Sequence, residues 1–579
     1  DLHAANELDD VGRCPTPRLS RARGPTPQAP PSRARRASTA SAPDQQACRN
    51  RIGFTRRFWK TTPGPSSPDG LPGHASCSDR RVLASLRSAV LFGIDATPVL
   101  VEVDVAFGMP TFTMVGLPDT SVRESRDRVR SAIRNSGYEF PPHRITVNLG
   151  PADVRKAGAA FDLPIALGVL AAQGVVTRRS ISDVLVLGEL SLDGAIQPTR
   201  GVLPIAAAAG RAGATTLLLP ASNAGEAAVV TGLRILPVSH LIDAVGALND
   251  PDQVREVPRP PPSSPALAPD LADVRGQRLA RRALEIAAAG AHNLLLVGPP
   301  GSGKTMLARR MAGILPPLTV DEALEVTTVH SVVGLLPSGE GLMMTRPFRA
   351  PHHSISTAAL VGGGSIPRPG EISLAHNGVL FLDEMLEFAR PALEALRQPL
   401  EEGTVSVVRA ARSARFPARF VLVGALNPCP CGYAGDEHHV CRCTPSQREQ
   451  YQARLSGPLR DRLDLTVDVP ALPPEWLGNG PPGESSSDVR TRVLEAHDYR
   501  RHRLAGHPAG LPGESASPAS TPELEPAAAQ MLARAARRLG LSARGFDRVG
   551  RVARTIADLA RTERIGADHI AEALQFRGA

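Results

Sequence analysis

Residues 293–305 read NLLLVGPPGSGKT, and this stretch decides the fold of the chain. Its first five residues form a short apolar run that predicts a buried strand, and residues 306–311 (MLARRM) predict a helix. Between them lies a full match to G-x-x-x-x-G-K-T, in the strand–loop–helix context that this motif requires. The glycines let backbone N–H groups surround the phosphates of a nucleotide, and the helix adds its positive amino end. The stretch therefore predicts an α/β domain that holds a nucleoside triphosphate.

The motif assigns roles to individual side chains. We expect Lys304 to bridge the β- and γ-phosphates of ATP and the Thr305 hydroxyl to bind Mg²⁺. A chance glycine-rich turn is the alternative, and the flanking strand and helix argue against it. The predicted nucleotide-binding residues are Gly298, Pro299, Pro300, Gly301, Ser302, Gly303, Lys304 and Thr305.

A second apolar strand, GVLFL at residues 378–382, ends in two adjacent acids. This pattern predicts that Asp383 orders the Mg²⁺ shell, as a further nucleotide-binding residue, and that Glu384 polarises the attacking water. A capped strand end is the alternative, because Asp and Glu often begin helices. The spacing of about 80 residues from the glycine-rich loop favours the catalytic interpretation.

Three further polar residues fit the same site. The predicted strand over residues 420–426 ends at Asn427, which fits a sensor that helps to hold the water. Arg462 fits a finger that reaches the γ-phosphate held by a neighbouring subunit, with Arg460 as a close rival. An ordinary surface residue remains the alternative for each of them.

Length and charge set broad limits. The 579 residues predict three or four domains. The net charge is +9, but residues 1–80 hold 13 Lys and Arg against 7 Asp and Glu, so this segment supplies +6 (13 − 7). The rest is close to balanced, and the charge of the whole chain is therefore weak support for a nucleic-acid partner. No apolar run approaches the roughly 20 residues of a membrane span, and no signal peptide is apparent, so we expect a cytoplasmic protein without a membrane partner.

Composition divides the chain into five segments. The first is a basic tail whose composition predicts disorder. Equally open is that the start site is wrongly assigned, so that residues 1–81 are translated upstream sequence and Val82 is the true start. Next come a segment of alternating strands and helices and a Pro-rich linker. The nucleotide motifs follow, and then a helical lid with low-complexity insertions. The expected bounds are 1–81, 82–248, 249–270, 271–470 and 471–579.

Several motifs occur in a fixed order that is typical of one family. They are VRGQ at 274–277, the glycine-rich loop, APHH at 350–353, PGEISLAHNG at 369–378, NPCPCG at 427–432, SGPLRDRLD at 456–464 and SARGFDR at 542–548. Together they resemble the YifB/ComM family of magnesium-chelatase-like AAA+ ATPases, and the resemblance covers residues 82–579. It implies an α/β AAA+ domain with a helical lid, in a hexameric ring that binds ATP and Mg²⁺ between subunits. It also implies a lid arginine on the phosphate, with Arg544 as the best match and Arg548 and Arg551 as alternatives.

The resemblance extends to a DNA partner. In the wider clade shared with MCM helicases, a hairpin before the sensor strand faces the ring pore, and residues 402–412 resemble that hairpin. Arg409 and Arg412 would then contact the DNA backbone without reading its sequence, and a solvated charge pair is an equally open alternative. ComM-type members are associated with ATP-driven branch migration, so a DNA helicase or translocase is the implied activity. A chelatase-type motor subunit and a nucleotide-regulated scaffold are the alternatives.

Residues 82–248 resemble the Lon-type protease fold, an S5-like α/β domain. Proteolysis there would require a serine nucleophile and a lysine base. The matching positions hold Ala160 and Leu203, so the domain lacks the catalytic dyad and is expected to be an inactive relative. A chelatase motor subunit would not be expected to carry this fused domain, which argues against that alternative.

The cysteines after residue 81 form one cluster with the spacing C-x-C-x9-C-x-C. Four thiolates in a polar loop predict a structural Zn²⁺ site, although the usual spacing is wider. A reduced loop and, less favoured in a reducing cytoplasm, a disulfide are the alternatives. The candidate ligands are Cys429, Cys431, Cys441 and Cys443, with His438 or His439 as a replacement for one of them.

Overall fold

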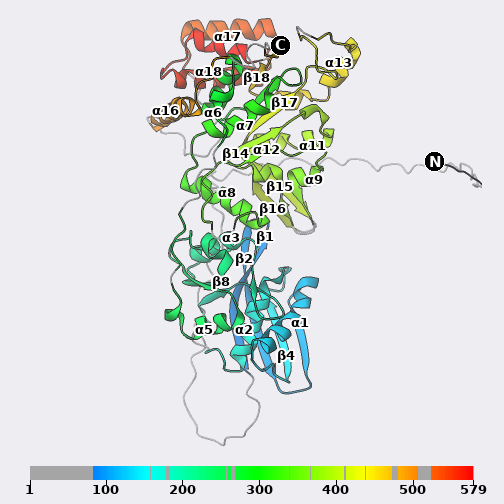
Figure 1. Ribbon diagram of the computed structural model, residues 1–579, viewed down its shortest axis with the longest axis vertical. Coiled ribbons are helices and arrows are strands. Elements are labelled where there is room, and N and C mark those ends of the chain that lie inside the picture. Colours follow the sequence, from blue (N-terminus) through cyan, green and yellow to red (C-terminus); the bar gives the residue numbers. More distant parts are fainter. Residues whose placement is uncertain are drawn as a thin grey trace, which may run out of the picture. The chain divides into compact units, whose positions relative to one another are not determined.

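The computed structural model describes most of residues 82–577 and shows two large sheets in that part of the chain (Figure 1). The expectation for the tail, residues 1–81, lies outside the described residues, as do parts of the expected linker and lid insertions. The internal gaps in the description are 157, 178–180, 182, 256, 262–267, 338–339, 365–366, 410–411, 437–438, 473–479 and 506–522.

The first large sheet has seven strands in the order β3-β4-β2-β1-β5-β8-β9. β1 and β2 form an antiparallel hairpin, and β5, β8 and β9 extend the sheet in parallel. The strands are β1 (Val82–Phe92), β2 (Asp95–Ala106), β3 (Thr111–Val115), β4 (Arg144–Gly150), β5 (Val184–Val186), β8 (Thr216–Pro220) and β9 (Arg234–Val238). A small pair, β6 (Glu189–Leu190) and β7 (Ile196–Gln197), lies apart from this sheet.

Helices cover both faces of this sheet, and the strand sequences show it. In β5, Val184 and Val186 join one buried cluster while Leu185 joins another, because successive side chains of a strand point to opposite faces. The first cluster includes residues of α1 (Thr120–Asn135), α2 (Asp162–Ala172) and α5 (Leu241–Asn249); the second includes residues of α3 (Val202–Arg211) and α4 (Ala224–Ala227).

The second large sheet has five parallel strands in the order β11-β14-β17-β10-β18. The predicted strands over 293–297, 378–382 and 420–426 are confirmed as β10, β14 and β17. The five strands are β10 (Leu294–Val297), β11 (Phe348–Arg349), β14 (Gly378–Leu382), β17 (Phe420–Leu426) and β18 (Leu465–Asp468). Around them lie α6 (Arg278–Gly290), α7 (Lys304–Ile314), α8 (Val320–Val333), α9 (Thr357–Val361), α10 (Glu371–Leu374), α11 (Arg390–Glu394), α12 (Arg397–Glu402), α13 (Pro445–Gln452) and α14 (Gly457–Arg460), with the strand pairs β12 (Gly362–Gly363)–β13 (Arg368–Pro369) and β15 (Thr404–Arg409)–β16 (Arg412–Pro417).

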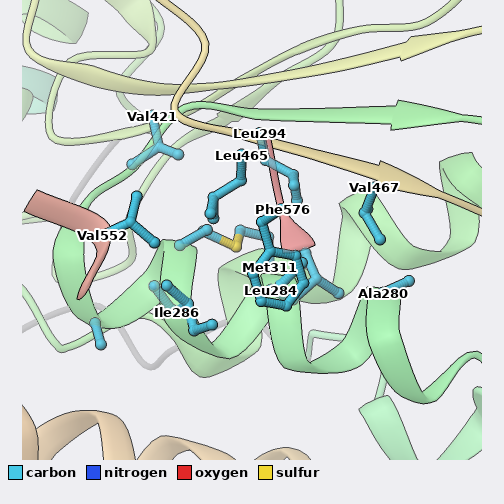
Figure 2. Packing of buried hydrophobic residues seen from close by; sticks show 14 of the residues in the cluster. Ala280, Leu284, Ile286, Leu294, Met311, Val421, Leu465, Val467, Val552 and Phe576 are labelled. Carbon is cyan, nitrogen blue, oxygen red and sulfur yellow. The ribbon is translucent and has the colours of Figure 1, made fainter. Parts of the chain in front are cut away.

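The core behind the glycine-rich loop joins the sheet to the carboxyl-terminal helices. Figure 2 shows Leu294 and Leu465 of the sheet, Met311 of α7 and Val552 of α18 in one buried cluster, with Phe576 among them. Burying one such side chain contributes about 1.5–3 kcal/mol, so the lid helices are tied to the nucleotide domain by packing. These helices are α16 (Ser486–Ala505), α17 (Pro526–Leu539), α18 (Ala543–Leu559) and α19 (Ala567–Gln575). Among the described residues, no helix has both the length and the apolar character that crossing a membrane requires.

Candidate nucleotide site and cysteine cluster

The glycine-rich loop follows β10 directly, and its course depends on its glycines. A Cβ on Gly298 would lie 2.1 Å from the carbonyl oxygen of Val469, so a larger residue does not fit there. Gly301 and Gly303 have φ of +78° and +94°, the left-handed region that glycine adopts without strain. α7 then begins at Lys304. The loop therefore leads directly into a helix amino end, where backbone N–H groups are free to bind an anion.

Four of the predicted site residues meet at the carboxyl edge of the sheet. The Lys304 Nζ donates hydrogen bonds to the carbonyls of Gly298 (2.7 Å) and Pro299 (2.8 Å) and to the Asn427 Oδ1 (3.2 Å). The Thr305 hydroxyl donates to the Asp383 Oδ2 at 2.7 Å. These bonds place a cation, a hydroxyl, a carboxylate and an amide around the start of α7.

Lys304 is 8 % exposed, and its burial lowers the pKa of the ammonium group despite the opposing charges of Asp383 and Glu384. A buried ammonium group without a full counter-charge favours an anionic ligand, because phosphate oxygens would supply the charge that carbonyls supply only in part. Thr305 and Asp383 together offer the oxygen ligands that Mg²⁺ prefers. The residues present therefore fit a nucleotide with its metal.

The Glu384 backbone N–H donates to the Asp383 Oδ1 at 3.0 Å, but the Glu384 side chain lies outside the hydrogen bonds described above. The φ of Glu384 is +49°, rare for a residue with a side chain, and its carboxylate is 57 % exposed. The His353 Nδ1 lies 3.5 Å from the Glu384 Oε2, and the His353 ring lies against His352 with 4.1 Å between ring centroids. Sequence analysis gave His353 no role. The available signal was its place just after β11, the strand that pairs with β14.

Arg462 belongs to the opposite edge of the sheet. Its backbone carbonyl accepts a hydrogen bond from the Asn293 side chain at 2.9 Å, and Asn293 immediately precedes β10. A strand rises about 3.3 Å per residue, so the four residues of β10 put roughly 13 Å between this point and the glycine-rich loop. Arg462 thus starts from the edge remote from the nucleotide residues of its own chain.

Arg462 and Arg544 converge on one carboxylate. The Arg462 guanidinium, 10 % exposed, forms an ion pair with the Glu401 Oε1, and the Arg544 Nη2 lies 3.3 Å from the same oxygen. The rivals have other partners, since Arg548 donates to the Leu463 carbonyl and Arg551 pairs with Asp464 at 3.1 Å. Arg460 is exposed, and its carbonyl accepts from Arg548 at 3.3 Å. Glu401 was not predicted, because nothing in the sequence links it to arginines 61 and 143 residues away.

The β15–β16 hairpin is antiparallel, with Arg409 opposite Arg412 at its closed end. Its buried residues belong to the same core cluster as residues of β14 and β17, so the hairpin is rooted in the nucleotide domain. Val408 is 68 % exposed near the closed end. The four residues buried in the root are Val405, Val407, Ala414 and Phe416.

The four predicted cysteines come together in the loop between β17 and α13. All four are free thiols, and their Sγ atoms lie within 4.8 Å of one another. The Cys429 and Cys431 Sγ atoms are 3.3 Å apart, and each lies 3.6 Å from the Cys441 Sγ. Four sulfurs at about 2.3 Å from a tetrahedral Zn²⁺ would be about 3.8 Å apart. The cluster therefore has the dimensions of a metal site, and the disulfide alternative is not the state described.

The surroundings of the cluster act on two of its cysteines in opposite directions. Backbone N–H groups of Tyr433 and Arg442 lower the pKa of Cys431 to about 6. Despite the backbone hydrogen bond with Cys431, by contrast, burial and the neighbouring Cys431 and Cys429 thiols raise the pKa of Cys443 to about 11. His439, one of the two alternative ligands, instead lies beside Asp436 (Nδ1 to Oδ1, 3.3 Å) and against the Tyr433 ring. His438 lies outside the described residues.

Three family models match the chain and together span most of it. "Magnesium chelatase, subunit ChlI" matches residues 270–477, "Subunit ChlI of Mg-chelatase" matches 101–223, and "Magnesium chelatase, subunit ChlI C-terminal" matches 483–577. The glycine-rich loop, Asp383, Glu384, Asn427 and Arg462 fall within the first of these matches, and Arg544 falls within the third.

Curated relatives match over nearly their whole length. The chain is 45% identical over 497 residues to the uncharacterized protein YifB of Escherichia coli, covering 86% of this chain and 97% of YifB. It is 44% identical over 501 residues to the competence protein ComM of Haemophilus influenzae, with the same two coverages. The magnesium-chelatase 38 kDa subunit of Rhodobacter capsulatus is more distant, 26% identical over 234 residues, which are 36% of this chain and 62% of the subunit.

Proposed function

Because the chain belongs to the YifB/ComM family of magnesium-chelatase-like AAA+ ATPases, we propose that it is an ATP-hydrolysing motor that acts on DNA. The hydrogen-bonded set of Lys304, Thr305, Asp383 and Asn427 is the observation that carries the ATPase. Lys304 neutralises the phosphates, Thr305 and Asp383 hold Mg²⁺, and Asn427 and Glu384 orient the water. The water attacks the γ-phosphorus, the bond to the β-phosphate oxygen breaks, and ADP and inorganic phosphate leave.

We propose a homo-oligomeric ring, a hexamer by resemblance, in which each nucleotide is completed by the neighbouring subunit. The supporting observation is that Arg462 starts from the edge of the sheet remote from its own glycine-rich loop. An arginine that stabilises the charge of the transition state must reach the phosphate, and a neighbour's phosphate is the one available to this edge. Arg544 shares the same carboxylate partner and so belongs to the same surface.

The DNA partner rests on the rooted β15–β16 hairpin and on the relative named competence protein ComM. Arg409 and Arg412 at its closed end would contact phosphates, and DNA branch migration in recombination or transformation is the proposed activity. The two side chains are the part of this proposal that needs direct testing.

A chelatase-type motor is the second candidate, favoured by the similarity to the magnesium-chelatase 38 kDa subunit. A ChlI model also matches residues 101–223, so the amino-terminal domain does not separate the two candidates as the sequence argument expected. The Lon-like fold of residues 82–248 is likewise a proposal. Ala160 lies in the 3₁₀ turn before α2 and Leu203 is buried in α3, and neither supplies a nucleophile or a base for peptide hydrolysis.

Turnover of ATP with and without forked or three-stranded DNA tests the proposal. Glu384→Gln should lower turnover by at least about 100-fold, because it removes the base near the water. The matched control Glu387→Gln, three residues away and paired with Arg454 at 3.1 Å, should leave turnover within about two-fold. An unchanged rate in Glu384→Gln would contradict the assigned catalytic role.

The DNA arm of the experiment separates the two candidates. DNA should raise turnover and its strands should be displaced, and Arg409→Ala with Arg412→Ala should weaken both effects while basal turnover persists. Arg234→Ala, an exposed arginine paired with Asp252, is the control. Turnover without any response to DNA would defeat the DNA proposal and favour a chelatase-type motor.

We also propose Zn²⁺ as a structural cofactor beside ATP and Mg²⁺. The Sγ atoms of Cys429, Cys431 and Cys441 lie 3.3–3.6 Å apart, and all four cysteine Sγ atoms lie within 4.8 Å of one another. The described residues of their loop belong to no helix or strand, and such a cluster of thiols suits a soft tetrahedral ion. The thiols bind as thiolates and release their protons to solvent.

A further inference from the structure

The cysteine loop touches the nucleotide site at its beginning. Asn427 opens the loop, and its Oδ1 accepts a hydrogen bond from the Lys304 Nζ at 3.2 Å. Cys429, which is fully buried, follows two residues later. A constraint on the Cys429 sulfur is therefore separated from the lysine–asparagine hydrogen bond by only one residue of chain, Pro428.

A second contact lies between the cysteine pairs. Gly432 has φ of +87°, and a Cβ on it would lie 2.6 Å from the Pro300 Cδ of the glycine-rich loop. The Gly432 backbone thus approaches the Pro300 ring more closely than a side chain at position 432 would allow. Gly432 follows Cys431 directly, and its N–H donates to the Cys429 carbonyl at 2.9 Å.

The space between the two loops is a cavity of 510 Å³. Gly298 and Pro299 line one side of it, and Ala434, Gly435 and Asp436 of the cysteine loop line another. The cysteine loop and the glycine-rich loop therefore line the same cavity.

The described residues of the cysteine loop, 427–443, belong to no helix or strand, so the hydrogen bonds of regular secondary structure do not fix the shape of this loop. A metal held by two cysteines at each end of the segment would fix it, because closing a flexible loop removes conformational freedom. The same ion would set the positions of Asn427 and Gly432 against Lys304 and Pro300.

We propose that a Zn²⁺-like ion bound by the four cysteines holds the cysteine loop, residues 427–443, against the glycine-rich loop, residues 298–305, and that the occupancy of this metal site determines the rate of ATP hydrolysis. This inference rests on the proposed ATPase function for its effect on rate. Its structural half, a metal-dependent ordering of residues 298–305, stands independently of any turnover.

Metal content and hydrogen exchange test the structural half on the full chain. Purified protein should contain one zinc per chain. Removing it with a chelator, or by Cys431→Ser with Cys441→Ser, should speed amide exchange in residues 298–305 and 427–443, and added Zn²⁺ should restore slow exchange only where all four thiols are present. Protein that neither holds zinc nor takes it up, or exchange in 298–305 that ignores the metal, would overturn the proposal whatever the turnover.

Two glycine variants isolate the contact from the metal. Gly432→Ala keeps all four thiols but collides with Pro300, whereas Gly213→Ala, in a turn remote from the cysteine loop along the chain, has φ of +83° and meets nothing within 4 Å. Both should retain zinc, and only Gly432→Ala should lose about ten-fold or more in kcat, comparable to metal removal. Equal loss in both variants, or zinc-free protein with unchanged kcat, would overturn the coupling. Zinc-dependent exchange in a chain without ATPase activity would support the coupling and defeat the proposed function.

Discussion

The two edges of the five-stranded sheet both carry charged side chains, but these side chains differ in the partners that the chain provides for them. At the carboxyl edge, Lys304, Thr305 and Asp383 belong to one hydrogen-bonded set around the start of α7. The amino edge anchors the loop of Arg462, whose guanidinium pairs with the Glu401 carboxylate and donates to the Pro458 carbonyl at 2.6 Å. The carboxyl edge has the groups that a nucleotide and its metal require. At the amino edge, Arg462 and Arg544 share the Glu401 carboxylate.

This difference indicates where the missing counter-charge comes from. Arg462 and Arg544 place two cations on one Glu401 oxygen, so their combined charge exceeds that of the carboxylate. A polyphosphate brought by a neighbouring subunit would satisfy both, since charge-assisted pairs with phosphate are among the strongest hydrogen bonds. On the proposed function, the carboxyl edge binds a nucleotide, and the surface that carries Arg462 and Arg544 meets a neighbouring subunit.

The largest effect expected from this comparison is that of Arg462→Ala, which should lower ATP turnover on the order of 10³-fold while nucleotide binding persists. Mixing it with Lys304→Ala, inactive alone, should restore part of the turnover, because some interfaces of a mixed ring pair an intact Lys304 with an intact Arg462. Arg460→Ala, an exposed arginine on the same segment, should stay near wild type. If mixed assemblies form but recover no ATP turnover, Lys304 of one subunit and Arg462 of its neighbour do not act at the same nucleotide.

The sequence predicted the carboxyl edge well, because its residues follow the ends of strands that are recognisable as apolar runs. Strands β10, β14 and β17 are parallel neighbours, so residues that follow them are brought to one edge by topology alone. Glu401 escaped prediction, because its contacts depend on how separate elements pack and leave no pattern in spacing. His353 belongs to the APHH motif, but its contact with Glu384 depends on how β11 packs beside β14. The cysteine spacing predicted a cluster correctly, whereas its contact through Gly432 with Pro300 became visible only in three dimensions.

The next effect concerns the stability of the surface that carries Arg462 and Arg544. Asp464 is 7 % exposed, and its carboxylate accepts from the Asn293 N–H at 3.0 Å and pairs with Arg551 at 3.1 Å. Burial raises the pKa of this carboxyl, but the nearby His292 ring (Nδ1 to Oδ2, 3.8 Å), the charge of Arg551 and the Asn293 N–H outweigh burial and hold the pKa below its usual value. Asp464→Asn should therefore lower the free energy of unfolding by about 1–3 kcal/mol at neutral pH.

The pH dependence of that loss follows from the sign of the shift. A carboxyl with a depressed pKa stabilises the fold above its unfolded pKa of about 3.9, and this contribution disappears as the pH falls through the folded value. The difference between wild type and Asp464→Asn, measured by urea unfolding, should thus be constant above about pH 5 and shrink below pH 4. Asp461→Asn, which loses a more exposed pair with Arg548, is the control and should cost at most about 1 kcal/mol. A loss that stays constant down to acid pH would contradict a role for the Asp464 charge.

The smallest effect tests the carboxyl edge, where the carboxylate of Glu384 lies outside the hydrogen-bonded set. His353 lies 3.5 Å from its carboxylate and is itself flanked by the His352 and Phe388 rings, so we expect His353 to orient Glu384 toward the water. His353→Ala should lower kcat about ten-fold, or about 1.4 kcal/mol in barrier, with KM unchanged, because orientation acts in the transition state. His353→Gln, which keeps a polar atom, should recover part of the loss. His352→Ala, which removes the tilted neighbouring ring and its hydrogen bond to Ser354 but not the group beside Glu384, should cost less. A rise in kcat in His353→Ala would contradict this role. It would mean that His353 holds Glu384 away from the position in which Glu384 acts on the water.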